Sequence, residues 1–290
     1  MSMPSPDSPA YAPAVPFGIR RLAPRIGAEI SGLDLSQPLA ADTLSRLRAA
    51  WLEHHILLFR DQSLTEAQQA RFATYFGEPV GARSAQRQGP DADARVMLIS
   101  NVRENGKLIG QLPDGELQFH ADSVFLERPL MGAILYAVEL PSTGGNTIFT
   151  NVEAAYDALT DAEKERFGEL KALNAFDYAT QVRTGRFDPA SGPHFVHPVI
   201  RTHPETGRKA IFVNRLMTQE IVGLDADESD SLLARLWEEC ERPAYAYEHV
   251  WKLGDVLIWD NRSTQHARTD FPAGERRLLR RVGIEGDVPF

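Results

Sequence analysis

Cysteine is almost missing from this chain, which has 290 residues and a single cysteine, Cys240. One thiol cannot form an internal disulfide, and it cannot supply a cysteine-based zinc cluster. Such a shortage is typical of proteins that stay in a reducing compartment. We therefore expect a cytoplasmic protein.

Basic residues are fewer than acidic ones, and long apolar runs are missing. Lys and Arg number 31 against 40 Asp and Glu, which gives a formal net charge of −9. An acidic chain lacks the positive surface that binds phosphate backbones, so no nucleic-acid partner is expected. No apolar run is long enough to cross a bilayer, and the first residues do not resemble a secretory signal, so we expect no membrane partner.

Short strand patterns dominate the second half of the chain. They are "LQFHADSVF", "MGAILYAVEL", "NTIFTN", "HPVIRTH", "KAIFVN", "DVLIWDN" and "RRLLRRVGI". Since helices do not alternate with these strands, the pattern predicts an antiparallel barrel or jelly roll. Helical patterns such as "ADTLSRLRAAWLEHH" predict helices packed outside it. The expected fold class is mainly β with flanking helices (α+β).

The chain also divides by composition. Residues 1–15 are rich in proline, serine and alanine, which predicts a mobile N-terminal tail. Residues 16–290 are expected to form a single domain. Within it, residues 81–116 are polar, contain glycine and are weakly periodic, with one strand at "RVMLIS". Loops of this length often cover binding sites, so this segment is predicted to be a lid.

A histidine and an aspartate lie two residues apart in "QFHADSVF". Residues at that spacing share one face of a strand, so His120 and Asp122 can both point into a barrel. His266 is the best candidate for a third ligand, because it follows a buried strand and a polar turn. Two histidines and one carboxylate suit a non-haem Fe(II) site. The alternative is a strand-end histidine beside a solvated aspartate.

Arginines crowd the last strand pattern. Arg277 and Arg281 share one face with Leu279, whereas Arg276 and Arg280 share the other face, which we expect to be solvated. Inward-facing arginines need buried anions, and no acidic run elsewhere supplies them. A dicarboxylate co-substrate would.

Four motifs resemble those of the taurine and 2,4-dichlorophenoxyacetate dioxygenase family: "FHAD", "ELPSTGGNTIFTN", "IWDNRSTQHARTDF" and "ERRLLRR". They stand in family order, and the similarity covers nearly the whole chain. The resemblance implies a double-stranded β-helix (jelly-roll) core that uses Fe(II), 2-oxoglutarate and O2.

The resemblance also implies roles for individual residues. His120, Asp122 and His266 would bind iron, and Thr147 and Arg277 would hold the distal carboxylate of 2-oxoglutarate. Arg281 would meet an anionic group of the primary substrate or support the 2-oxoglutarate site. The reaction would hydroxylate a C–H bond and release succinate and CO2.

The substrate is less closely specified. Taurine enzymes carry an asparagine four residues before the first iron ligand, where this chain has Glu116, which we take as a candidate substrate contact. The stretch "FGEPVGARSAQRQG" also lacks the histidine and tyrosine of taurine enzymes. Both departures favour a small carboxylate-bearing substrate. A taurine, alkylsulfonate or sulfate-ester dioxygenase of the same family is the first alternative.

Two alternatives of other classes remain. One is a cupin-like jelly-roll metalloprotein that does not use 2-oxoglutarate, which would have no need of Thr147 and Arg277. The other is a non-catalytic sensor, against which the complete ligand set argues. A homo-oligomer, as dimer or tetramer, is compatible with the sequence.

Overall fold

The computed structural model describes residues 16–81, 92–111, 115–176 and 187–290. The predicted tail lies outside the described residues, and so do residues 82–91 and 112–114 of the predicted lid. The single domain expected over residues 16–290 stays a prediction. Within the described part of the chain, no helix combines the length and the apolar character needed to cross a membrane.

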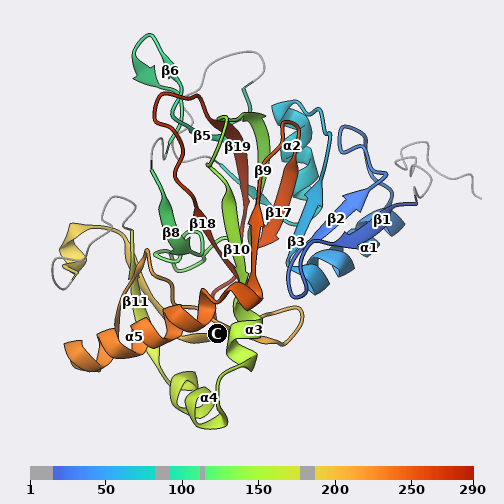
Figure 1. Cartoon of the computed structure of the whole chain (residues 1–290). Coiled ribbons are helices and arrows are strands. Elements are labelled where there is room, and N and C mark those ends of the chain that lie inside the picture. The colour runs from blue at the N-terminus through green and yellow to red at the C-terminus, as the bar shows by residue number, and fades with distance from the viewer. Residues whose placement is uncertain (1–15, 82–91, 112–114, 177–186) are drawn as a thin grey trace, which may run out of the picture.

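A large sheet of eight strands forms one wall of the molecule (Figure 1). Its strands, in spatial order with β5 beside β19, are β1 (Gly18–Arg21), β2 (Ala28–Ser31), β3 (Ile56–Phe59), β17 (Val256–Asp260), β9 (Gly132–Glu139), β19 (Leu278–Ile284), β4 (Pro79–Val80) and β5 (Met97–Ser100). The neighbours are antiparallel, except for the parallel pair β2 and β3. Sequence-distant strands therefore meet in one sheet.

Two helices cover the outer face of this sheet, α1 (Ala41–His54) and α2 (Glu66–Thr74). Helix α2 begins at a capping box in which Thr65 and Gln68 satisfy each other's backbone amides. Trp51 from α1 and Phe72 from α2 pack with Ile134 and Ile258 of the sheet in one buried cluster. This layer confirms the expectation that helices pack outside the strands.

A second sheet of four strands faces the first one (Figure 1). Its strands, in spatial order, are β16 (Ala246–His249), β10 (Thr147–Asn151), β18 (Thr264–Arg268) and β8 (Leu117–His120). Phe149 of this sheet packs with Leu135, Trp259 and Leu279 of the larger sheet. The two facing antiparallel sheets confirm the predicted jelly-roll core with its mainly β composition.

Most of the remaining elements gather at one end of the two sheets (Figure 1). They are the helices α3 (Val152–Asp157), α4 (Asp161–Gly168) and α5 (Ala226–Cys240), the three-stranded sheet β12 (His194–Pro198), β11 (Lys171–Ala175) and β15 (Thr218–Ile221), and the pair β13 (Ile200–Thr202) and β14 (Lys209–Ile211). A short hairpin, β6 (Arg103–Glu104) and β7 (Lys107–Leu108), lies within the predicted lid. Leu233 and Leu236 of α5 pack with Ile211 and Val213 in a separate apolar cluster.

Candidate active site

Three potential metal ligands meet between the two sheets. Strands β8 and β18 are antiparallel partners, and their register places His120 directly opposite His266. One ligand atom each from His120, Asp122 and His266 lies within 4.8 Å of the others. The two imidazole rings are 4.2 Å apart between centroids. The structure thus brings together all three residues that the sequence selected.

The position of Asp122 corrects the reasoning that selected it. Strand β8 ends at His120, so Asp122 does not share a strand face with that histidine. It opens a turn instead, and the next residue, Ser123, has the left-handed backbone angle φ of 61°. The turn returns the carboxylate toward the site, where Oδ1 lies 4.0 Å from His120 Nε2. The predicted proximity is right, but the predicted local structure is wrong.

The protonation states suit a cation. Burial lowers the pKa of both histidines, and for His266 burial together with His120 lowers the pKa to about 3. Burial alone would raise the pKa of Asp122, but Arg281 and the two histidines outweigh it and hold that pKa at about 2. His120 Nδ1 donates a hydrogen bond to the Gln118 carbonyl, 2.8 Å away, which leaves Nε2 as the ligand atom. Two neutral imidazoles and one carboxylate form the donor set that Fe(II) oxygenases use.

Arg277 is a buried cation in the same cavity. Its guanidinium donates to the Gly145 carbonyl from Nε and Nη2, at 3.3 and 2.9 Å. In the part of the chain that the structure describes, no carboxylate pairs with it. Burial, and to a lesser extent Arg268, lowers the pKa of Arg277 to about 9. A carboxylate from a bound molecule would compensate this burial.

Thr147 completes this anion site. Its Oγ1 accepts a hydrogen bond from the indole N–H of Trp251, at 3.0 Å. Because that donor fixes one side of the oxygen, the hydroxyl proton remains for a bound acceptor. Gly145 leaves room for the arginine, since a Cβ there would lie only 2.7 Å from Arg277 Nε. Thr147 and Arg277 therefore line one cavity with a hydroxyl and a guanidinium that can both donate to an acceptor.

A cavity of about 410 Å³ holds these groups, a size typical of small-molecule sites. The three metal ligands, Thr147, Arg277 and Arg281 line it. Much of the remaining wall is apolar, formed by residues such as Met97, Ile99, Leu117, Phe125 and Leu126. Met97 and Ile99 belong to the described part of the predicted lid. Whether that segment opens and closes stays a prediction.

The contacts of Arg281 and Glu116 differ from those that the sequence predicted. Arg281 donates from Nη2 to Asp122 Oδ2 at 2.6 Å, so its anion comes from this chain. Glu116 is exposed and is not among the residues that line the cavity, so the geometry does not support a direct substrate contact.

Arg276, which precedes β19, and Arg280, which lies on it, were both expected to be solvated, and only the first is. Arg276 is exposed and pairs with Glu139, as a solvated side chain does. Arg280, in contrast, is half-buried, donates to the Leu64 carbonyl and lies 4.5 Å from the ring centroid of Tyr136. The strand is not at an edge here, because β9 and β5 flank it. Contacts with Leu64 and Tyr136 therefore replace water around Arg280.

Sequence reasoning missed two residues that support the site. One is Trp251, whose contact with Thr147 spans 104 positions. The other is Asn261, whose side chain contacts the backbone of Asp122 across 139 positions. No local signal in the sequence indicates either contact.

Comparisons with known proteins agree with this geometry. The model of the family described as "Taurine catabolism dioxygenase TauD, TfdA family" matches residues 18–282. An (S)-phenoxypropionate/alpha-ketoglutarate-dioxygenase of Sphingobium herbicidovorans is 33% identical over 93% of this chain and 96% of its own length. An alpha-ketoglutarate-dependent sulfate ester dioxygenase of Pseudomonas putida is 32% identical over 97% of this chain and 93% of its own length.

A solved structure shows the same architecture. The crystal structure of a taurine dioxygenase from Burkholderia xenovorans superposes with a TM-score of 0.79 at 32% identity, over 94% of this chain and 90% of that one. The resemblance found in the four motifs is thereby confirmed along nearly the whole sequence. The chain belongs to the TauD/TfdA family of 2-oxoglutarate-dependent dioxygenases.

Proposed function

We propose that this protein hydroxylates a C–H bond of a small carboxylate-bearing substrate, using Fe(II), 2-oxoglutarate and O2 and releasing succinate and CO2. One observation carries the proposal. The same cavity contains a buried His–Asp–His ligand set and, separately, a buried guanidinium with a hydroxyl beside it. A dicarboxylate that chelates a metal through its 2-oxo acid end needs both features.

Each residue has a defined task in this proposal. His120, Asp122 and His266 would hold Fe(II), which when bound supplies the oxygen activation and the oxidative decarboxylation of the 2-oxo acid. Arg277 and Thr147 bind and orient the distal carboxylate of 2-oxoglutarate. The apolar wall excludes water from the reacting carbon, which limits unproductive turnover.

The primary substrate is proposed from Arg281 and from the apolar wall. Arg281 presents a guanidinium beside the metal ligands, while Phe125 and Leu126 offer a surface for an apolar body. A guanidinium can donate hydrogen bonds to carboxylate and sulfate groups alike. The similar proteins named above include a phenoxypropionate and a sulfate ester dioxygenase. The departure from the taurine pattern in "FGEPVGARSAQRQG" counts against taurine, and we take a carboxylate as the first candidate and a sulfate ester as the second.

The test is succinate release by anaerobically purified, Fe(II)-loaded protein that is given 2-oxoglutarate and O2. A panel of aryloxy acids, amino acids, sulfate esters and sulfonates would be compared, with His120→Ala as the blank. Stimulation by carboxylates alone supports the proposal. Stimulation by sulfate esters alone would show that the substrate is a sulfate ester and not a carboxylate. A visible band that depends on 2-oxoglutarate checks co-substrate binding independently of the substrate.

The alternatives of other classes predict different results. A jelly-roll metalloprotein that does not use 2-oxoglutarate would bind metal but show no such band. A non-catalytic sensor would show the band without succinate release for any substrate. A homo-oligomer and a cytoplasmic location stay predictions.

A further inference from the structure

The backbone of Asp122 is held by a side chain rather than by a sheet. Because β8 ends at His120, the peptide groups of Asp122 lie outside the strand. The amide of Asp122 donates to Asn261 Oδ1 at 2.7 Å, and Asn261 Nδ2 donates to the carbonyl of Asp122 at 3.0 Å. Nδ2 also donates to the Leu130 carbonyl at 2.8 Å. The Asn261 carboxamide therefore makes the two backbone hydrogen bonds to Asp122 that a neighbouring strand would otherwise make.

Asn261 is well placed for this contact. It is 1% exposed and lies in the tight turn between β17 and β18, five residues before His266. The turn is fixed on both sides of the chain, since the amide of Asn261 donates to the Met131 carbonyl and that of Asp260 donates to the His55 carbonyl. We call the three side-chain hydrogen bonds of Asn261 the clamp. The clamp joins the turn that carries Asp122 to the strand that carries His266.

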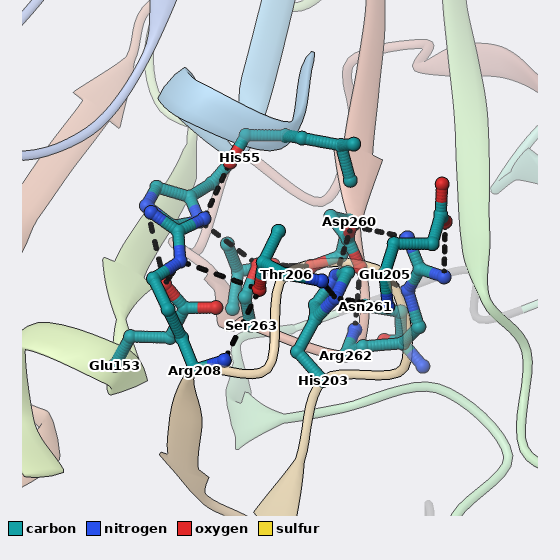
Figure 2. Close-up of polar contacts among 12 residues, drawn as sticks. His55, Glu153, His203, Glu205, Thr206, Arg208, Asp260, Asn261, Arg262 and Ser263 are labelled. Carbon is teal, nitrogen blue, oxygen red and sulfur yellow. Dashed lines mark hydrogen bonds and ion pairs between the residues drawn. The ribbon is translucent and has the colours of Figure 1, made fainter. Parts of the chain in front are cut away.

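A buried polar network holds the turn from behind (Figure 2). Asp260 accepts from Arg262 Nε at 2.9 Å and Nη2 at 2.7 Å, and it contacts His203 Nε2 at 3.0 Å. Arg262 Nη1 also donates to Glu205 at 2.8 Å. On the other side of the turn, Ser263 Oγ lies 2.9 Å from His55 Nδ1. Asp260, Arg262 and Ser263 are all at most 2% exposed, so the geometry of the network is restricted.

We propose that Asn261 is a positioning residue that fixes the carboxylate ligand Asp122 for metal binding, and that the Asp260–Arg262 ion pair keeps Asn261 in place. The proposal rests on the proposed metal site. A ligand on a turn that is free to move loses conformational freedom when a cation binds, and the clamp removes that cost beforehand. Groups that orient metal ligands in this way typically affect metal affinity about 10- to 100-fold.

The test is a titration of the metal-free protein with Co(II), followed by the visible absorption of the bound ion. Asn261→Leu keeps a similar volume but removes all three side-chain hydrogen bonds. We expect its Co(II) dissociation constant to rise by about 10- to 100-fold. Asp260→Asn should raise it less, because the turn is loosened while the clamp itself remains.

A matched control separates positioning from general destabilisation. Asn174 is another fully buried asparagine; it bonds to the Ala172 carbonyl and to Thr218, and it does not contact Asp122. Asn174→Leu should lower the melting temperature and leave the Co(II) affinity of the folded protein unchanged. If Asn261→Leu does not fold, Asn261→Ser, which cannot reach both peptide groups of Asp122, takes its place.

The outcomes are distinct. Weaker Co(II) binding in the Asn261 variant alone supports the clamp. Equal affinity in wild type and the Asn261 variant overturns it, and so does an equal loss in both asparagine variants. If wild type and Asp122→Ala bind Co(II) equally well, the proposed metal site itself is wrong.

Discussion

Two arginines of one chain segment, Arg277 and Arg281, reach the same cavity in opposite electrostatic situations. Among the described residues, Arg277 meets carbonyl oxygen but no carboxylate, and burial lowers its pKa to about 9. Arg281, four residues later, forms a 2.6 Å ion pair with Asp122. Under the proposed function, the first arginine would form an anion site that a bound molecule completes. The second is already paired with a proposed metal ligand, so a substrate anion at Arg281 would share it with Asp122.

The largest effect is expected from Arg277→Met. Truncating one partner of a buried charge pair costs about 2–5 kcal/mol, so the KM for 2-oxoglutarate should rise by about 30-fold or more. The melting temperature of the ligand-free protein should stay the same or rise, because a buried charge without a counter-ion is removed. Steady-state kinetics and thermal melting check the two parts. A clear fall in melting temperature would contradict the view that, among the described residues, Arg277 lacks a carboxylate counter-ion in the free protein.

Arg281→Met should have the opposite effect on folding. Against the effect of burial, Arg281 is the main group that holds the folded-state pKa of Asp122 at about 2, below its unfolded value of about 4, so the ion pair contributes stability at neutral pH. That contribution is present above pH 4 and is lost as the pH falls toward 2. The difference in unfolding free energy between wild type and variant should therefore shrink over this range.

Urea unfolding of the metal-free proteins at several pH values measures this difference. Arg281→Lys is the control, since it keeps the charge and should keep part of the stability. A difference that does not change with pH would show that Arg281 acts through packing rather than through the charge of Asp122.

The contrast between the two arginines also marks how far the sequence alone reaches. Strand alternation placed Leu279 and Arg281 correctly on the inner face, because a period of two is a local property, whereas Arg277 reaches the cavity from just before β19. The partner of Arg281 was not predictable in this way, since Asp122 lies 159 positions away and outside the strand to which it was assigned. A turn with a left-handed residue at Ser123 leaves no periodic signal.

The residues of the candidate site also divide into those that the sequence identified and those that it did not. The family motifs identified His120, Asp122 and His266, and the pairing of β8 with β18 explains why two of them meet. Asn261 lies within one of the four motifs, but neither it nor Trp251 was selected as a site residue. Their contacts with Asp122 and Thr147 depend on the complete fold, which sequence spacing does not encode.

A smaller effect is expected from Trp251→Phe, which tests the hydroxyl that assists Arg277. Phenylalanine keeps the ring but cannot donate to Thr147 Oγ1. A hydrogen bond of this kind is worth about 1 kcal/mol, so the KM for 2-oxoglutarate should rise by about 5-fold. Trp237→Phe, on α5, is the matched control and should leave the KM unchanged. Equal values for both variants would show that Trp251 does not orient Thr147.

The smallest effect is expected from Arg276→Ala, directly beside Arg277 in the sequence. Arg276 points to the opposite face and forms an exposed ion pair with Glu139 at 2.6 Å. Exposed pairs of this kind contribute little, because water and salt screen them. The KM for 2-oxoglutarate and the melting temperature should match those of wild type within error. A rise in KM comparable with that of Arg277→Met would mean that net positive charge, and not the buried position of Arg277, attracts the co-substrate.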